Sequence, residues 1–174
     1  MFEWIEAHQV MLTLLASLIG GGFVLFQWRK QIGIRRSEFT YQILNELRRN
    51  KEITQTSYMI EYGNFDYTPA FHGDRELEQK IDELLSILNY TCYLLKSKSI
   101  CKRDFSIFRY RVVWILKSQD IQAYLWNLYH WCKFNQTPCS FQYLIDMGIR
   151  EKLFSNDFLL KQCNHFVDRK YLNF

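Results

Sequence analysis

Proline and glycine are scarce in this chain. Its 174 residues include only two prolines, Pro69 and Pro138, and seven glycines. There is no internal repeat and no low-complexity linker, and aromatic residues make up 17% of the sequence, a composition that argues against disorder. No convincing run of alternating apolar and polar residues predicts a strand. The sequence therefore predicts an all-α fold.

Catalytic and metal-binding motifs are also missing. The sequence contains no Walker loop, no GxGxxG, no GxSxG and no HExxH, and its five cysteines form no CxxC pair. Cys163 and His165 lie close together, but residues two apart on a helix face different directions. The histidines are scattered along the chain: His8, His72, His130 and His165. We therefore expect no enzymatic activity, no metal and no cofactor, and we expect several cysteines to act as small core residues.

Formal charge is absent from Ala7 to Trp28, a run of 22 residues. At about 1.5 Å of helical rise per residue the run is about 33 Å long, enough to cross a hydrocarbon core of about 30 Å. Trp4 and Trp28 bracket it, where amphipathic rings favour the headgroup zones. We predict a transmembrane segment in residues 1–28, with the span at about 7–28, followed by a cytoplasmic helical domain in residues 29–174.

Basic residues are absent before the apolar run and follow directly after it. The leader carries Glu3 and Glu6 and no Lys or Arg, whereas a signal peptide begins with positive charge. The positive-inside rule places the N-terminus outside and residues 29 onward in the bacterial cytoplasm, with the span in the inner membrane. Two alternatives stay open, a cleaved signal peptide and a buried helix of a soluble protein. The residues expected to contact anionic headgroups are Arg29, Lys30, Arg35 and Arg36.

Small and polar residues gather on roughly one side of the span. Small side chains in a line let two helix backbones approach closely in lipid, where packing drives association. The stripe therefore predicts either a plain seam between copies, or no partner at all, or the lining of a narrow pore in an oligomer such as a tetramer. Its members are Gln9, Thr13, Ala16, Ser17, Gly20, Gly21 and Gln27.

Helical periodicity continues beyond the span. The first helix is expected to run on to a break at Asn50, and a short helix over 51–62 to end at Gly63. Residues 63–73 predict an ordered aromatic-rich loop, and Asp74 can cap the next helix. That helix is the clearest, with apolar positions 77, 81, 84, 85, 88, 92 and 95. Further helices are expected at 103–116, at 120–134, and near 141–147 with an end at Gly148, followed by a weakly helical tail at 157–171.

A basic segment with interleaved aromatic residues follows the clearest helix. Of 18 acidic residues in the chain, Glu3 and Glu6 precede the span, so the predicted domain has 16 against 22 basic residues, a net charge of +6. Cations beside aromatic faces can hold phosphates. The alternative is that these charges solvate a helix whose aromatic residues point inward. The residues proposed for an anionic ligand are Lys96, Lys98, Lys102, Arg103, Arg109 and Arg111.

Three segments together carry a resemblance. They are FQWRKQIGIRR at the end of the apolar run, EFTYQILNELRRN after it, and the later LEQKIDELLSILNYTCYLLKSKSI before the basic segment. Over about residues 10–130 the chain resembles a large group of uncharacterised bacterial single-span membrane proteins with a small helical cytoplasmic domain. Its architecture is similar to that of nucleotide-gated antiphage membrane effectors, of the Hailong type or of type III CRISPR signalling.

The resemblance implies a homo-oligomeric membrane effector of antiviral defence. Its cytoplasmic domain would sense an anionic, nucleotide-like second messenger, and its assembled spans would perturb or permeabilise the inner membrane as an ion channel does. Its partners would be other copies of itself and the lipid bilayer, with no nucleic acid expected. The alternative is a membrane-tethered scaffold without channel activity that holds a cytoplasmic partner at the bilayer. A third reading, regulation by nucleic acid bound near the membrane, predicts a steep salt dependence of binding.

Overall fold

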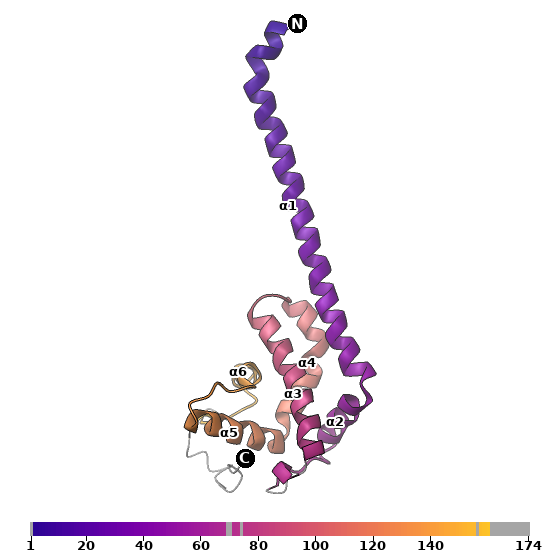
Figure 1. The fold of residues 1–174 in the computed structure, drawn as a ribbon, viewed down its shortest axis with the longest axis vertical. Coiled ribbons are helices and arrows are strands. Elements are labelled where there is room, and N and C mark those ends of the chain that lie inside the picture. The colour runs from indigo at the N-terminus through magenta and orange to yellow at the C-terminus, as the bar shows by residue number, and fades with distance from the viewer. Residues whose placement is uncertain (1, 69–70, 74, 156, 161–174) are drawn as a thin grey trace. The chain divides into compact units, whose positions relative to one another are not determined.

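The protein is all-helical over the residues that its structure describes, as the sequence predicts (Figure 1). The structure is a computed structural model that describes residues 2–68, 71–73, 75–155 and 157–160, without the side chains of residues 2–7, 10 and 73. In this part of the chain six α-helices and one short 3₁₀ helix follow one another. They are α1 (Phe2–Arg49), α2 (Lys51–Glu61), η1 (Phe71–Gly73), α3 (Arg75–Lys96), α4 (Lys102–Lys117), α5 (Gln119–Phe134) and α6 (Gln142–Arg150).

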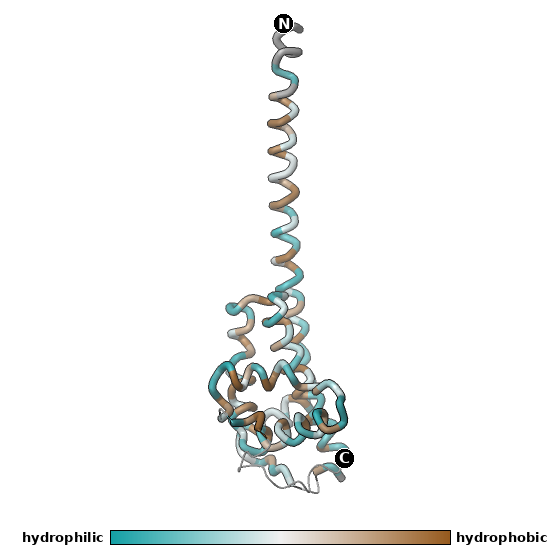
Figure 2. Tube along the Cα trace, turned by 90° about the vertical axis from the view of Figure 1, so that its left-hand side faces the viewer, coloured by the Kyte–Doolittle hydropathy of each residue, from teal (hydrophilic) through white to brown (hydrophobic). Residues whose placement is uncertain are grey.

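The chain divides into two compact units, residues 1–39 and residues 40–174. The first unit is a single helix, the greater part of α1, which runs without interruption through its glycines. Every side chain from Met11 to Gln31 is exposed. The apolar run is brown and white in Figure 2, and teal, hydrophilic residues become frequent beyond it. In the part of the chain that is described, α1 is the one helix long and apolar enough to cross a membrane.

The break between α1 and α2 falls at Asn50, which confirms the predicted boundary. The Asn50 side-chain oxygen accepts from the backbone N–H groups of Glu52 at 3.0 Å and Ile53 at 3.3 Å. These bonds satisfy donors at the start of α2 that have no partner within a helix. Gly63, with φ +71°, follows the other end of α2, as its position in the sequence indicates.

The core of the helical domain forms around α3, which contacts α2, α4, α6 and η1. Five of the predicted apolar positions are buried: Ile81, Leu84, Leu85, Leu88 and Cys92. The two outermost predicted positions, 77 and 95, are only half-buried, and Leu94 is buried at the C-terminal end of α3. Leu94 also accepts the backbone N–H of the buried Ile100, so the chain folds back over it after α3.

Helix α5 is buried on more sides than its apolar pattern predicts. Ile121, Tyr124, Leu125 and Cys132 are buried as expected, and Leu128 and Tyr129 are half-buried. Polar residues are buried as well, and the side-chain amides of two of them donate hydrogen bonds. The Gln122 side-chain amide donates to the backbone carbonyl of Leu116 at 2.8 Å, and the Asn127 amide donates to the Tyr67 hydroxyl at 2.7 Å.

The predicted end of α6 at Gly148 is wrong, because the helix continues to Arg150. A Cβ atom at Gly148 would lie 2.5 Å from the ring of Phe154, which is itself buried and stacked on Phe158. The glycine therefore admits an aromatic ring against the helix. Of the predicted C-terminal helix, residues 157–160 form turns, and the rest of that prediction, with Cys163 and His165, lies outside the described residues, as does Asp74.

Candidate functional site

The polar hydroxyls of the span are bonded within α1. The Thr13 hydroxyl donates to the backbone carbonyl of Gln9 at 2.8 Å, and the Ser17 hydroxyl donates to that of Thr13 at 2.9 Å. Both donors are therefore satisfied without water, as the interior of a bilayer requires. The remaining lone pairs and the small side chains leave this side of the helix able to pack against another surface.

The glycines of the span are not required by any close contact among the described residues. A Cβ atom at Gly20, Gly21 or Gly22 would meet no other atom within 4 Å, and all three residues are helical. Each costs about 1 kcal/mol of helix propensity relative to alanine. With about 100° of rotation per residue, Gly20 lies centrally among Gln9, Thr13, Ala16, Ser17, Gly21 and Gln27, whereas Gly22 lies about 200° away. The predicted stripe is therefore one continuous arc of α1, exposed at each described position after residue 10.

No protein-family model, curated protein or solved structure matches the chain. Six cations are predicted to bind an anionic ligand, and all of them lie in α3, in α4 or in the turn between these helices.

Three of these six cations have partners inside the domain. The Lys96 ammonium lies 2.9 Å from Asp146 Oδ2 and 5.1 Å from the centre of the Tyr143 ring, and its hydrogen bond to Asp146 raises the pKa of Lys96. Arg109 lies 2.6 Å from Glu151 Oε2. Arg111 donates to the backbone carbonyl of Leu47 at 3.1 Å, in the last turn of α1. These contacts join α3 to α6, α4 to the residue that follows α6, and α4 to the last turn of α1.

The other three cations are close together in the sequence and exposed. Lys98 lies in the turn between α3 and α4, and Lys102 and Arg103 are the first two residues of α4. No hydrogen bond or ion pair to any of their side chains occurs among the described residues. The carboxylate nearest in sequence, Asp104, accepts the backbone N–H of Cys101 at 3.0 Å and so caps α4. Of the six predicted residues, these three are thus accessible cations without a partner among the described residues, and they lie at one turn.

The aromatic residues of α4 divide into two groups. Phe105 and Phe108 are buried in the core, as the alternative reading of this segment expects. Tyr110 and Trp114 are exposed, with ring centres 5.9 Å apart. The Tyr110 hydroxyl donates to Glu61 at 2.7 Å, and the Lys117 ammonium lies 5.5 Å from the centre of the Trp114 ring. The exposed rings therefore lie toward the C-terminal half of α4, away from Lys102 and Arg103.

The cations predicted to contact headgroups belong to the first unit. Arg29, Lys30 and Arg35 are exposed, and Arg36 is half-buried. They follow the apolar run directly along one helix, as the positive end of a span does.

A partly buried polar network that includes Tyr67 and His72 of the 63–73 loop was not predicted from the sequence. The Tyr67 hydroxyl lies 2.9 Å from His72 Nε2, and His72 Nδ1 lies 2.9 Å from Glu78 Oε1. The Tyr67 backbone N–H donates to Asp120 at 3.0 Å. These groups bond one another across the loop, α3 and α5, so they fix the loop. The signal in the sequence was the aromatic loop itself, but its partners are up to 60 residues away.

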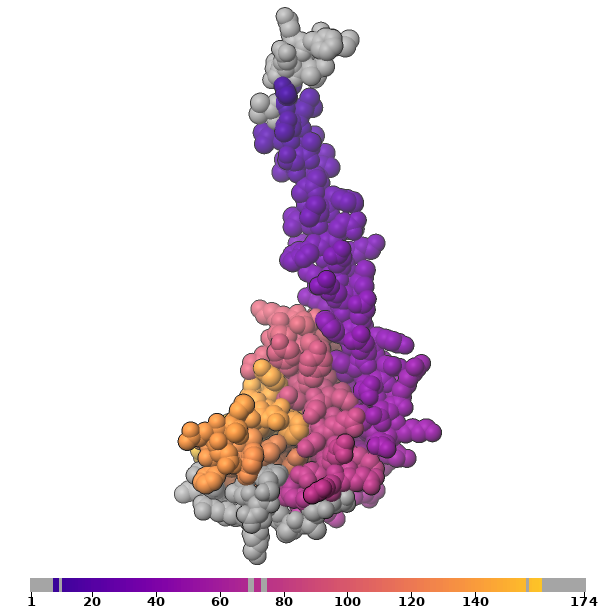
Figure 3. Space-filling model, viewed as in Figure 1, coloured from indigo at the N-terminus to yellow at the C-terminus, as the bar shows by residue number. Residues whose placement is uncertain are grey.

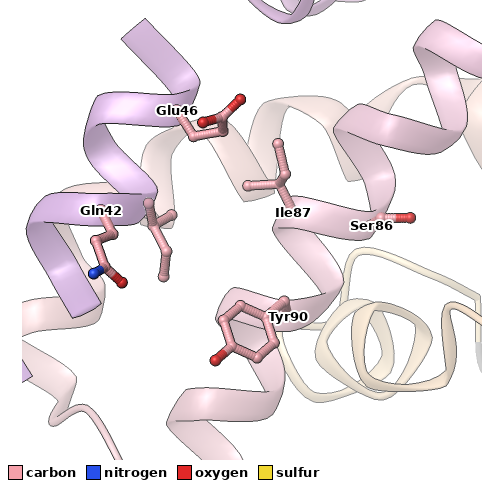
Figure 4. A pocket seen from close by; sticks show the side chains of 6 residues that line it. Gln42, Glu46, Ser86, Ile87 and Tyr90 are labelled. Carbon is pink, nitrogen blue, oxygen red and sulfur yellow. The ribbon is translucent and has the colours of Figure 1, made fainter. Parts of the chain in front are cut away.

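An apolar groove of about 390 Å³ lies between the end of α1 and α3, inside the helical domain. Figure 4 shows Ile87 and Tyr90 of α3 pointing toward α1, with Gln42 and Glu46 opposite. The charged residue in its lining is a glutamate, which opposes an anionic ligand. In the described part of the chain no group of three or more His, Cys, Asp or Glu side chains is placed to hold a metal ion.

Proposed function

We propose that this protein is a single-span membrane effector that self-associates through the glycine-centred face of its span. The observation that carries the proposal is the apolar run of α1. Its most apolar window has no residue buried, although it contains large side chains such as Leu18 at 75% and Ile19 at 66% exposure. Burying such side chains is worth about 1.5–3 kcal/mol each, so lipid or a second helix is expected to cover them.

Self-association accounts for two of the three consecutive glycines, Gly20 and Gly21, which lie on the proposed face. Together they cost about 2 kcal/mol of helix propensity, and no described atom of the same chain needs the space that they leave. A second copy whose helix backbone approaches along this face would use that space. Two copies meet naturally in this way because the same face is present on each.

The helical domain supplies the signal in this proposal. It lies in the bacterial cytoplasm, since the basic residues follow the span, and it binds an anionic, nucleotide-like ligand through accessible cations. A ligand that binds one arrangement of the oligomer more tightly shifts the population toward it. The assembled spans then perturb or permeabilise the inner membrane, which is the action of an antiphage effector of this architecture.

Substitutions on two faces of the same glycine run test the proposal. Gly20→Leu with Gly21→Leu places bulk on the proposed interface, whereas Gly22→Leu places it about 200° from Gly20 and is the matched control. We expect the double variant to run as a monomer in native-size measurements in detergent and to lose depolarisation of a membrane-potential dye in cells. The control is expected to keep both. A monomeric wild-type protein, or equal behaviour of the two variants, would contradict the proposal.

One observation favours the scaffold alternative. Aromatic side chains are exposed along α2 and α4. Tyr58 of α2 and Tyr62, which follows α2, stack with ring centres 5.8 Å apart, and Tyr110 and Trp114 of α4 form a second pair. Aromatic residues are enriched where proteins bind one another. Replacing residues 1–28 with an unrelated membrane span separates the two functions. A scaffold keeps its activity after the exchange, and a self-associating effector loses it.

A further inference from the structure

The turn between α3 and α4 lies at the end of the helical domain that contains Thr40, the first residue of that unit. Arg111 of α4 bonds the carbonyl of Leu47 in α1. Counting back from that contact, Arg103 lies about 12 Å earlier along α4 and Thr40 about 10 Å earlier along α1. The two helices therefore reach the same end of the domain. Figure 4 agrees, since Gln42 of α1 lies opposite Tyr90 of α3, and Glu46 lies opposite Ile87.

The turn is held in one conformation by bonds to its own backbone. Ile100 is 1% exposed, and its N–H donates to the carbonyl of Leu94 at 3.2 Å. The hydroxyls of Ser97 and Ser99 lie 2.9 Å apart. The three accessible cations thus project from a fixed turn, so little backbone freedom is lost when they bind a surface.

Lys98 occupies an unfavourable backbone conformation. Its φ of 60° lies in the left-handed region, where glycine or asparagine is the usual residue after a helix. A cation at this position complements the dipole at the C-terminus of α3. Lys98 is also exposed, so its charge can act on a partner outside the chain.

The shape of the turn favours one of two phosphate ligands, a lipid headgroup over a free nucleotide. Free nucleotides bind in concave sites, and the groove described above contains none of the three cations. In the view of Figure 3 the α3–α4 turn forms a rounded corner of the domain. Cations on a rounded corner suit a flat array of phosphates better than a single enclosed one.

We propose that Lys98, Lys102 and Arg103 bind the anionic headgroups of the bilayer that holds the span. The inference rests on the membrane anchoring in the proposed function. Only residues 29–39 separate the apolar run from Thr40, the first residue of the helical domain. Attraction between the turn and the phosphates docks the domain on the membrane, and a soluble anion that competes for the same cations releases it.

Hydrogen–deuterium exchange of the full-length protein in nanodiscs tests this docking. One set of nanodiscs contains phosphatidylcholine alone, and the other contains added phosphatidylglycerol. The first backbone N–H groups of α4 have no acceptor within the helix, so their exchange reports access of water to the turn. We expect slower exchange over residues 97–103 in the anionic nanodiscs, and loss of this protection in high salt.

Two triple variants with the same change of charge provide the comparison. Lys98→Gln with Lys102→Gln and Arg103→Gln is expected to abolish the protection. Lys51→Gln with Lys133→Gln and Lys152→Gln is expected to keep it, and Lys152 has a positive φ of 56° that matches Lys98. Unchanged exchange in the core peptides of α3 and α5 shows that each variant is folded, and the salt titration of the wild-type protein tests the docking without any variant.

The outcomes separate the docking from the function on which it rests. Equal exchange in both lipids, with the protein inserted, overturns the docking alone. Protection by cyclic di-AMP in neutral nanodiscs, without protection by anionic lipid, assigns the turn to a free nucleotide and also overturns it. Extraction of the protein from membranes by alkaline carbonate overturns the membrane anchoring itself.

Discussion

The Tyr124 hydroxyl donates to Asp82 Oδ1 at 2.5 Å and so joins the buried Tyr124 of α5 to the half-buried Asp82 of α3. Burial raises the pKa of Asp82 above its ordinary value of 3.8, and the bond from Tyr124 opposes that rise. Glu78 also raises the pKa of Asp82, whereas His72 lowers it. The carboxyl and the phenol are therefore a coupled pair, and each sets the cost of burying the other.

Tyr124→Phe should destabilise the domain more at neutral than at acid pH. A carboxyl whose pKa is raised by folding contributes most to stability below its unfolded value and loses that contribution as pH rises through the folded value. Without the donated bond the Asp82 carboxylate is less stable, so we expect a loss of about 1–3 kcal/mol at about pH 8 and a smaller loss at about pH 4.5. Thermal unfolding of the protein in detergent, followed by circular dichroism, measures both.

Tyr110→Phe is the matched control for this prediction. Tyr110 also donates to a carboxylate, Glu61, but its side chain is 61% exposed. Its removal should leave the melting temperature nearly unchanged at either pH, because water replaces the lost donor. An equal effect of Tyr124→Phe at the two pH values would contradict the coupling with Asp82.

Gly148→Ala should destabilise the helical domain, because the new Cβ displaces the Phe154 ring. Overpacking of this kind costs about 1–3 kcal/mol. Gly33→Ala, also within a helix, places its Cβ in open space and should gain up to about 1 kcal/mol of helix propensity. Thermal unfolding of the two variants is expected to shift in opposite directions. A stabilising Gly148→Ala substitution would mean that the ring moves without cost.

Arg111→Gln should reduce stability without reducing the response to an anion. Its guanidinium bonds the carbonyl of Leu47, which also accepts the Thr54 hydroxyl at 3.0 Å. Losing a charged donor at a helix end costs about 1–2 kcal/mol. Arg109→Gln breaks only an exposed pair with Glu151 and should cost less than about 1 kcal/mol. If Arg111→Gln melts normally but loses anion binding, Arg111 belongs to the ligand site as the sequence predicts.

Cys92 should resist alkylation in the folded protein. Burial raises the pKa of its thiol to about 12, and that of Cys139 to about 11, so little thiolate is present near neutral pH. Among the four cysteines that the structure describes, iodoacetamide at about pH 8 is expected to modify the half-buried Cys101 first and Cys92 last. Mass spectrometry of the peptides gives the order, and unfolding in urea should remove it. Rapid labelling of Cys92 would show that α3 opens locally.

Local features of the fold could be predicted from the sequence because their causes are local. The break at Asn50 depends on bonds that span three residues, and the buried face of α3 depends on a repeat of three or four. The predicted helix end at Gly148 was wrong because this glycine makes room for the ring of Phe154, a contact that no periodicity in the sequence indicates. Gly63 therefore follows the end of a helix, α2, whereas Gly148 lies within a helix, α6, and makes room for a ring.

The partners of the cations in the candidate anion site could not be predicted for a comparable reason. A run of cations shows charge, but it does not show which carboxylates will fold against it. Lys96 and Asp146 are 50 residues apart, and Arg109 and Glu151 are 42 apart. Only the tertiary structure assigns these partners, and it leaves Lys98, Lys102 and Arg103 accessible.

At Lys98 the backbone and the charge have opposite requirements, because the positive φ favours glycine, which carries no charge. Lys98→Gly would relieve the backbone by about 1 kcal/mol and remove a cation in the same step. Substitutions that stabilise the turn would therefore remove this charge in the course of evolution, unless the function of the protein requires it. An inventory of natural or laboratory-evolved variants at this one position thus measures how much the organism needs the cation, independently of any assay of the membrane.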